Sequence, residues 1–144
     1  MTAVLPHHYK IGLDWSGQGA AQIVAGPRPA IPGGAPPEFD GEASWWSPEH
    51  LLLSAVSLCL MTTFQTFARR AGLDLRSYHG HSEAVLNKTP DGLRFTDLTL
   101  HVEVTVPAVE VEFARQLLGT AKEHCLVART LTTPITLETR VLPA

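Results

Sequence analysis

The strongest hydrophobic pattern in the chain is an apolar segment between residues 51 and 67. Its apolar residues cover most sides of a helix, which predicts a helix buried within this domain or in a subunit interface. Ser47 is a good N-cap and Pro48 fits the first helical position, so the helix begins here. Two arginines followed by Gly72 predict where it ends.

Alternating apolar and polar residues predict strands on both sides of this helix. Thr89-Pro90-Asp91-Gly92 reads as the turn of a long hairpin. The further elements that we predict are strands at 8–14, 20–25, 77–88, 93–106 and 133–142, a second helix at 109–124, and a turn or short helix at 126–131. The order β-β-α-β-β-α-β indicates an α+β fold, with one domain over residues 1–144.

Residues 26–37 are dense in proline and glycine. This composition predicts a surface loop without a helix or a central strand. A loop of this length in a small domain is often functional or lies over a partner.

Composition indicates an ordinary soluble protein, with 44% hydrophobic and 17% charged residues and a net charge of −3. This charge gives no reason to expect nucleic acid or an anionic membrane as partner. We see no apolar run near the roughly 20 residues that span a bilayer, and no signal peptide at the N-terminus. We therefore expect a cytoplasmic protein without a membrane partner, in which a lasting structural disulfide is rare.

The chain has two cysteines, Cys59 and Cys125. Cys59 lies inside the long apolar helix and could simply be a small buried hydrophobe. Cys125 follows Lys122 and His124 at the end of the second helix, where a nearby cation favours the thiolate. Their separation excludes a Cys-x-x-Cys motif. Inert core residues, metal ligands and redox catalysts all remain open from these residues alone.

A family resemblance favours the redox reading. The segment Ser47-Pro48-Glu49-His50-Leu51, with Cys59 ten residues after Glu49, resembles the Pro-Glu-x-Leu…Cys segment of the OsmC/Ohr family (osmotically inducible protein C and organic hydroperoxide resistance proteins). Cys125-Leu126-Val127-Ala128 stands where that family has Cys-Pro-x-Ser. The resemblance covers nearly the whole chain. It implies an OsmC-like antiparallel sheet with two main helices, in an intertwined homodimer.

The resemblance also implies a thiol peroxidase that acts on organic hydroperoxides in an oxidative stress response. Cys59 would attack the peroxide and become a sulfenic acid. Cys125 would then form a disulfide with it, and a small or protein dithiol would reduce that disulfide. The implied chemistry needs no metal, flavin, haem or other cofactor.

The family activates its attacking cysteine with an arginine that a glutamate holds, and Glu49 matches that glutamate. Glu49 is too far along a straight helix to touch Cys59 directly, because ten residues span about 15 Å. We expect it to act through an arginine, and the dimer interface offers one route. The chain has no arginine at either usual family position, so Arg28 in the Pro/Gly loop is the candidate. Lys10, Arg69 and Arg129 are reserves.

Other readings of the same residues remain. Trp45 and Trp46 could line a pocket for an apolar peroxide, pack against a partner, or staple the helix start. The fold could instead serve as a non-catalytic dimeric binder of an apolar ligand, as a thiol redox sensor, or as an acyl-thioester hydrolase. Seven histidines raise the question of a metal, and His79 and His81 share one strand face. We find no spacing typical of a zinc site and expect none.

Overall fold

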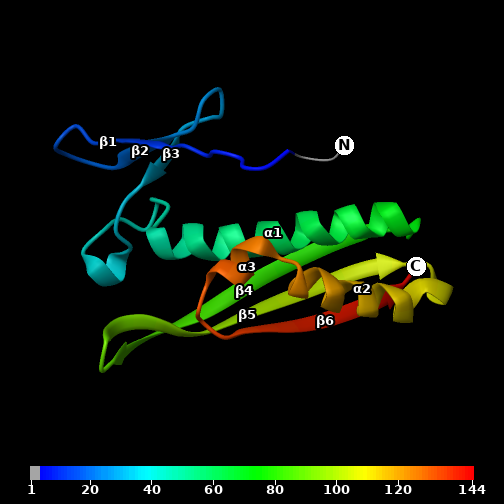
Figure 1. Ribbon diagram of the computed structural model, residues 1–144. Helices are drawn as coiled ribbons and strands as arrows, with labels where there is room; N and C mark the ends of the chain where they lie inside the picture. The colour runs from blue at the N-terminus through cyan, green and yellow to red at the C-terminus, as the bar shows by residue number, and fades with distance from the viewer. Residues whose placement is uncertain (1–3) are drawn as a thin grey trace. The chain divides into compact units, whose positions relative to one another are not determined.

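The computed structural model of the protein describes residues 4–144. Within them, the chain divides into two compact units, with the boundary between Leu51 and Leu52. From the sequence we expected a single domain over the whole chain. The long helix α1 (Pro48–Ala71) begins at the end of the first unit and continues into the second (Figure 1).

The N-terminal unit contains a three-stranded antiparallel sheet in the order β1-β2-β3. Its strands are β1 (Gly12–Asp14), β2 (Ala21–Val24) and β3 (Ile31–Gly33). The turn between β1 and β2 uses Gly17 and Gly19, with φ of 97° and 68°, conformations that favour glycine. This turn was predicted.

The Pro/Gly-rich segment is more ordered than the sequence suggested. It contains β3 and a short 3₁₀ helix, η1 (Pro37–Phe39). Neither was predicted. Pro32 is tolerated in β3 because β3 is the edge strand of this sheet, where a missing N–H costs no ladder bond to a further strand.

The start and end of α1 follow the sequence signals. The backbone N–H of His50 donates to Ser47 Oγ at 3.1 Å, which satisfies one of the free amides of the first turn. Arg69 and Arg70 lie in the last turn, and Gly72 follows with φ of 70°. The N-cap and the glycine stop are both confirmed.

The apolar character of α1 corrects one expectation. The helix has 24 residues, and its most apolar 18-residue window has a mean hydropathy of 1.6. By length and composition it could therefore cross a membrane, contrary to our prediction that no such run exists. Only 22% of that window is buried within the chain. The core helix of a soluble protein passes the same test, so this feature alone is weak support for a membrane span.

The C-terminal unit contains a second sheet, in the order β4-β5-β6. Strands β4 (Ser77–Thr89) and β5 (Gly92–Val106) form the predicted hairpin, and β6 (Ile135–Pro143) pairs with β5 in parallel. The connection from β5 to β6 carries η2 (Ala108–Glu110), α2 (Val111–Glu123) and α3 (Leu126–Thr130). A crossover of this kind returns the chain in the same direction, so the sheet is mixed and not purely antiparallel as expected.

One face of this sheet carries the core. The β5 residues Leu98, Leu100, Val102, Val104 and Val106 are buried. They share one hydrophobic cluster with Val56, Leu60, Phe64 and Ala68 of α1 and Ala114, Leu118 and Ala121 of α2. Figure 1 shows these helices on the same side of the sheet. The opposite face carries the polar side chains of the alternating pattern.

Candidate active site

Cys125 is held between the end of α2 and the start of α3, where it is the N-cap residue. Its side chain is fully buried in the core cluster. The sulfur lies 4.0 Å from the carbonyl oxygen of Val56 on α1. The short helix α3 therefore delivers this thiol to the middle of the long helix.

Cys59 lies on that same part of α1, one turn after Val56, and is partly buried. Both cysteines are free thiols, and Cys59 is close enough to Cys125 to influence the pKa of its thiol. The sequence reasoning required the fold to bring two distant cysteines together, and the fold does so. From the sequence, the pairing of Cys59 with Cys125 was predicted only through the family resemblance. In the structure, the two cysteines come close because α3 packs against α1.

The surroundings of Cys125 keep it protonated. Burial raises the pKa of the Cys125 thiol to about 11, and its hydrogen bond and charge interaction with Cys59 act in the same direction. The backbone amides of Ala128 and Val127 oppose this by donating to the sulfur. Cys125 is therefore a thiol at neutral pH, suited to donate a proton and not to attack first.

The expected cations do not act on Cys125. The His124 ring bonds to the Thr120 carbonyl oxygen at 2.9 Å and packs edge-on against Phe67, so it is held away along α2. Neither His124 nor Lys122 is among the groups that shift the Cys125 pKa. The expectation of a thiolate-favouring cation here was wrong, because desolvation dominates at a buried sulfur.

Tyr78 is a neighbour of the pair that the sequence reasoning missed. Burial raises its pKa to about 12, and the charge of Cys125 adds to the effect. Its ring lies 6.1 Å from that of Phe64 on α1. Tyr78 lies opposite buried Val104 in the β4–β5 ladder, so the alternation of β4 was a signal that could have found it.

An apolar cavity of about 380 Å³ opens beside α1 in the C-terminal unit. Gly80 lines it with Leu100 and Val102, and a side chain at Gly80 would approach the Tyr78 ring to 3.4 Å. Leu58, Met61 and Tyr78 also line the cavity. A ligand with a hydrophobic tail of modest size fits such a lining.

Glu49 lies in the first turn of α1, as predicted. Its Oε2 atom is buried and has no hydrogen-bond partner among the described residues. A buried carboxylate oxygen is costly to leave unpaired, so the side chain calls for a donor. The identity of this donor stays a prediction.

Arg28 donates from Nη1 to the carbonyl oxygen of Ala25 at 3.2 Å and is exposed. Its proposed role as the activating cation stays a prediction. Lys10, Arg69 and Arg129 are exposed as well. Nothing in the packing of these four residues singles one out.

The tryptophans before α1 have local structural roles. The Trp46 amide donates to the Pro32 carbonyl oxygen at 3.0 Å, and Trp46 forms an isolated bridge with Gly33. The Trp45 ring lies over Gly34, where an added Cβ would approach it to 2.4 Å. Trp46 also lines an apolar hollow of about 180 Å³ with Leu13, Ala21, Ile23, Gly33, Gly34, Pro48 and Leu51.

The histidines form a second cluster. His81, Glu83 and His101 place one ligand atom each within 4.8 Å of one another. We expected no metal site, because the sequence shows no spacing typical of zinc ligands. The third member comes from the neighbouring strand, and a sequence spacing does not reveal cross-strand neighbours.

The fold and the paired thiols define a member of the OsmC/Ohr class. A family model described as OsmC-like protein matches residues 41–140, and the chain belongs to this family. The chain is 27% identical over 136 residues to peroxiredoxin OsmC of Escherichia coli (strain K12), which covers 91% of this chain and 94% of that protein. Peroxiredoxin OsmC of Shigella flexneri matches to the same extent. The relationship is therefore distant.

Solved structures agree on the fold. An OsmC-like protein of unknown function from Vibrio cholerae superposes with a TM-score of 0.85 at 18% identity, over 94% of this chain and 100% of that one. An OsmC-like protein from Mycoplasma pneumoniae has a TM-score of 0.81 at 17% identity, over 96% and 99%. An organic hydroperoxide resistance protein of Bacillus subtilis has a TM-score of 0.67 at 16% identity, over 94% and 98%.

Proposed function

We propose that the protein is a thiol peroxidase that reduces organic hydroperoxides with Cys59 and Cys125. The observation that carries the proposal is that two free thiols from distant segments meet at α1, with the Cys125 sulfur 4.0 Å from the Val56 carbonyl oxygen, one turn before Cys59. The family relationship to peroxiredoxin OsmC supports the same chemistry. We further propose that the reaction takes place in the cytoplasm, as a defence against oxidative stress.

The first step is attack by the Cys59 thiolate on the terminal oxygen of the hydroperoxide. A sulfur–oxygen bond forms and the O–O bond breaks, so the sulfur is oxidised to a sulfenic acid and the peroxide is reduced. The departing alkoxide takes up a proton and leaves as an alcohol. The protonated Cys125 is the nearest thiol that can stabilise charge at the Cys59 sulfur.

The second step is condensation of Cys125 with the sulfenic acid. A disulfide forms and one water molecule leaves, carrying the hydroxyl of the sulfenic acid and the Cys125 proton. The contact of Cys125 with α1 means that little movement is needed. A dithiol reductant then restores both thiols by exchange and becomes a disulfide itself.

Glu49 is proposed as a positioning residue in this scheme. Its buried, unpartnered oxygen suits an arginine guanidinium, which would be placed to favour the Cys59 thiolate. Arg28 is the arginine that we propose for this role. The apolar cavity beside α1 suits the organic part of a hydroperoxide.

A homodimer is part of the proposal. Tyr9, Ile11, Leu13 and Trp15 alternate along the first strand region, and each is at least 65% exposed. Only Leu13 of these lies within β1 (Gly12–Asp14), but a row of exposed apolar side chains along one segment marks an interaction surface. The low burial of α1 has the same explanation, because a second copy would cover what this chain leaves open.

A binding function is the second candidate, favoured by the apolar cavity of about 380 Å³. In that case the same dimer would hold an apolar ligand, with Cys59 as a passive wall or as a redox sensor. Catalytic turnover separates the two candidates.

The test is consumption of cumene hydroperoxide by the purified full chain, with dithiothreitol or a lipoylated protein as reductant. We expect turnover that Cys59→Ser abolishes. Both thiols are partly or fully buried, so circular dichroism must show that the variant is folded. If the folded wild-type protein consumes no hydroperoxide but binds an apolar probe, the peroxidase proposal is wrong and the binding function takes its place.

A further inference from the structure

We propose that the outer face of the β4-β5-β6 sheet binds one divalent transition-metal ion through His81, Glu83 and His101. Glu138 orients His101 from the neighbouring strand. The three ligands lie on the sheet face opposite the core that holds the two cysteines. His81 and His101 also line the apolar cavity beside α1. Metal binding is measured without hydroperoxide, so its test does not depend on the peroxidase activity.

The backbone places the three ligands on one face. His81 and Glu83 are two residues apart on β4, so their side chains point the same way, and His101 lies directly opposite His81 on β5. A register shift between Val85 and Leu86 produces this arrangement. If the register found nearer the turn continued without this shift, His81 would pair with Leu100. Because directly opposite residues share a sheet face, His81 would then lie on the core face with Leu100.

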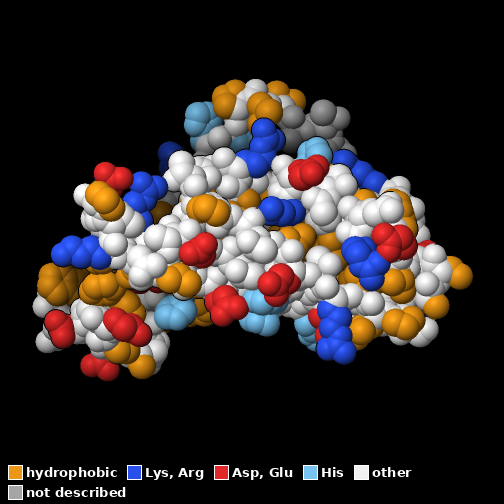
Figure 2. Space-filling view, turned by 90° about the horizontal axis from the view of Figure 1, so that it is seen from below, with side chains coloured by type: hydrophobic (Ala, Val, Ile, Leu, Met, Phe, Trp, Pro, Cys, Tyr) orange, Lys and Arg blue, Asp and Glu red, His pale blue; other side chains and the backbone are white. Residues whose placement is uncertain are grey.

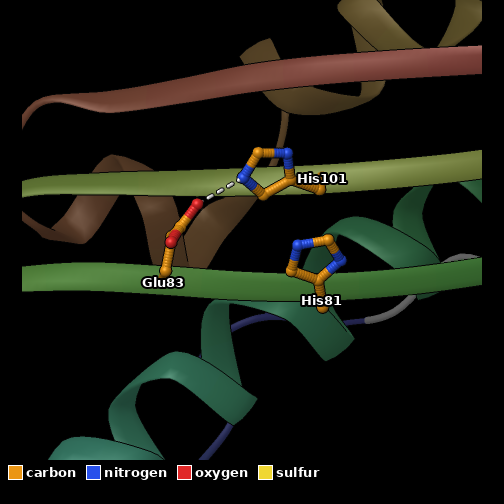
Figure 3. Close-up of side chains that lie close together, drawn as sticks. All are labelled: His81, Glu83 and His101. Carbon is orange, nitrogen blue, oxygen red and sulfur yellow. Dashed lines mark hydrogen bonds and ion pairs between the residues drawn. The ribbon is translucent and has the colours of Figure 1, made fainter.

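The three side chains lie close together. Figure 3 shows the rings of His81 and His101 and the Glu83 carboxylate on the same side of the two strands. The rings stack with centroids 4.4 Å apart and 9° between their planes. The ligand atoms of all three residues lie within 4.8 Å of one another. Figure 2 shows histidine and acidic side chains side by side on the face of the molecule that it views.

The hydrogen bonding of His101 calls for a cation. Its Nδ1 lies 3.1 Å from Glu138 Oε2, and its Nε2 lies 2.7 Å from Glu83 Oε1. A neutral imidazole has one N–H donor, so when Nδ1 donates to Glu138, Nε2 is an acceptor that faces another acceptor. A metal ion held between Nε2 and the carboxylate would turn this contact between two acceptors into shared ligation.

A metal ion fits this site because Glu138 already accepts a hydrogen bond from the second ring nitrogen of His101, as a carboxylate commonly does for a metal-bound histidine. Metal-bound histidines generally donate their second ring nitrogen to a carboxylate, which fixes the tautomer and strengthens the ligand. Here His101 would bind the ion through Nε2 while Nδ1–H donates to Glu138. Glu83 and Glu138 together balance the charge of a divalent ion.

The ligands need only small movements. Zinc bonds of about 2.0–2.2 Å set neighbouring ligand atoms roughly 3.3 Å apart in a tetrahedral site. The Glu83 side chain is 70% exposed and can open its 2.7 Å contact with His101. The His81 ring is exposed and can rotate out of its parallel stack, so that its lone pair converges on the ion.

The donor set selects the class of ion. Two imidazoles with one carboxylate suit Zn²⁺, Co²⁺, Ni²⁺ or Cu²⁺, whereas Mg²⁺ and Ca²⁺ prefer oxygen ligands. Three protein ligands leave a tetrahedral ion one position for water. We therefore expect an open, surface-accessible site of moderate affinity.

The test is titration of the tag-free, reduced full chain with Zn²⁺ by calorimetry, with Mg²⁺ as a comparison ion. We expect one Zn²⁺ per chain and no Mg²⁺ binding. His81→Ala and His101→Ala should each weaken Zn²⁺ binding by about tenfold or more, and Glu138→Gln by about tenfold without changing the stoichiometry. His79→Ala is the matched control, since His79 lies on the same face of β4 but outside the cluster.

Co²⁺ absorption distinguishes this site from the thiols. We expect visible bands typical of nitrogen and oxygen ligands and no thiolate charge-transfer band. Melting curves without metal should match between wild type and His81→Ala, because His81 is exposed.

Two results would overturn the proposal. One is Zn²⁺ binding that is equal in wild type and in folded His81→Ala, which would place the ion at another site. The other is a thiolate signature for the bound Co²⁺.

Discussion

The Cys125 sulfur lies 4.0 Å from the carbonyl oxygen of Val56, a residue 69 positions earlier in the chain. Val56 is one turn before Cys59 on α1, so this contact fixes the second thiol against the part of the helix that carries the first. The two cysteines therefore lie near each other while both are free thiols. The proposed chemistry uses this arrangement.

Replacing the resolving thiol should separate the two steps. In Cys125→Ser we expect one equivalent of cumene hydroperoxide to be consumed without a disulfide, because Cys59 still attacks and serine cannot form the S–S bond. The sulfenic acid should then be trapped by dimedone and detected by mass spectrometry. Wild type should give little adduct, and Cys59→Ser should give none. Equal dimedone labelling of wild type and Cys125→Ser would argue against Cys125 as the resolving residue.

The charge of Glu49 should matter for the rate. In Glu49→Gln we expect peroxide reduction to slow by roughly tenfold and its half-maximal rate to move to higher pH, because the arginine that favours the thiolate loses its anchor. The measurement is the pH profile of kcat/KM. Glu42→Gln is the control, an exposed glutamate before the helix. An unchanged profile in Glu49→Gln would remove Glu49 from the site.

Alkaline pH should destabilise the protein through Cys125. Its pKa rises from an ordinary 9.0 to about 11 in the fold, so the folded state holds its proton more tightly than the unfolded chain. This contribution to the free energy of unfolding is complete below about pH 9 and is lost as pH rises toward about 11. Tyr78, with a pKa raised to about 12, adds a loss of the same sign at slightly higher pH.

Urea unfolding between about pH 8 and about pH 11 measures this loss. Cys125→Ala should flatten the fall in stability relative to wild type, and Tyr78→Phe should flatten its upper end. A variant whose stability falls as steeply as that of wild type would contradict the assignment to that residue.

The N-cap of α1 should contribute measurable stability. Ser47 is fully buried, and its Oγ accepts the His50 amide at 3.1 Å. Ser47→Ala should lower the free energy of unfolding by about 1 kcal/mol. Ser44→Ala, at an exposed position before the helix, should leave stability nearly unchanged. Equal unfolding midpoints for the two variants in urea would show that this cap is not important.

The exposed apolar row at the first strand should hold the dimer. Leu13 is 65% exposed, and a charge there should weaken an interface that buries it. We expect Leu13→Glu to shift the mass measured by sedimentation from two chains toward one. Lys10→Glu introduces the same side chain at a polar position of this segment and should leave the mass unchanged. A wild-type protein that sediments as one chain would contradict the dimer itself.

The sequence was sufficient where structure is decided locally. The Ser47 cap, the Gly72 stop and the turn at Thr89–Gly92 depend on residues close together in the chain, and each was predicted. Non-local pairing was harder. The parallel partner of β5 depends on where the crossover through α2 and α3 returns, and a strand's own alternation does not encode its neighbour's direction.

The same distinction applies to the two sites. The cysteines were identified from a spacing and a resemblance, but the buried, protonated state of Cys125 depends on α3 packing against α1. The His81–His101 contact depends on one register shift at Val85, and a pattern of alternating residues does not reveal an extra residue in a strand. Both features follow from tertiary packing and not from local sequence.

The central claim is that Cys59 and Cys125 form one redox pair. The direct measurement is oxidation of the reduced full chain with one equivalent of cumene hydroperoxide and no reductant, followed by intact and peptide mass spectrometry. We expect consumption of the peroxide, loss of two hydrogen atoms per chain, and a peptide pair linked between Cys59 and Cys125. Unconsumed peroxide with both thiols still open to alkylation in the unfolded protein would contradict it.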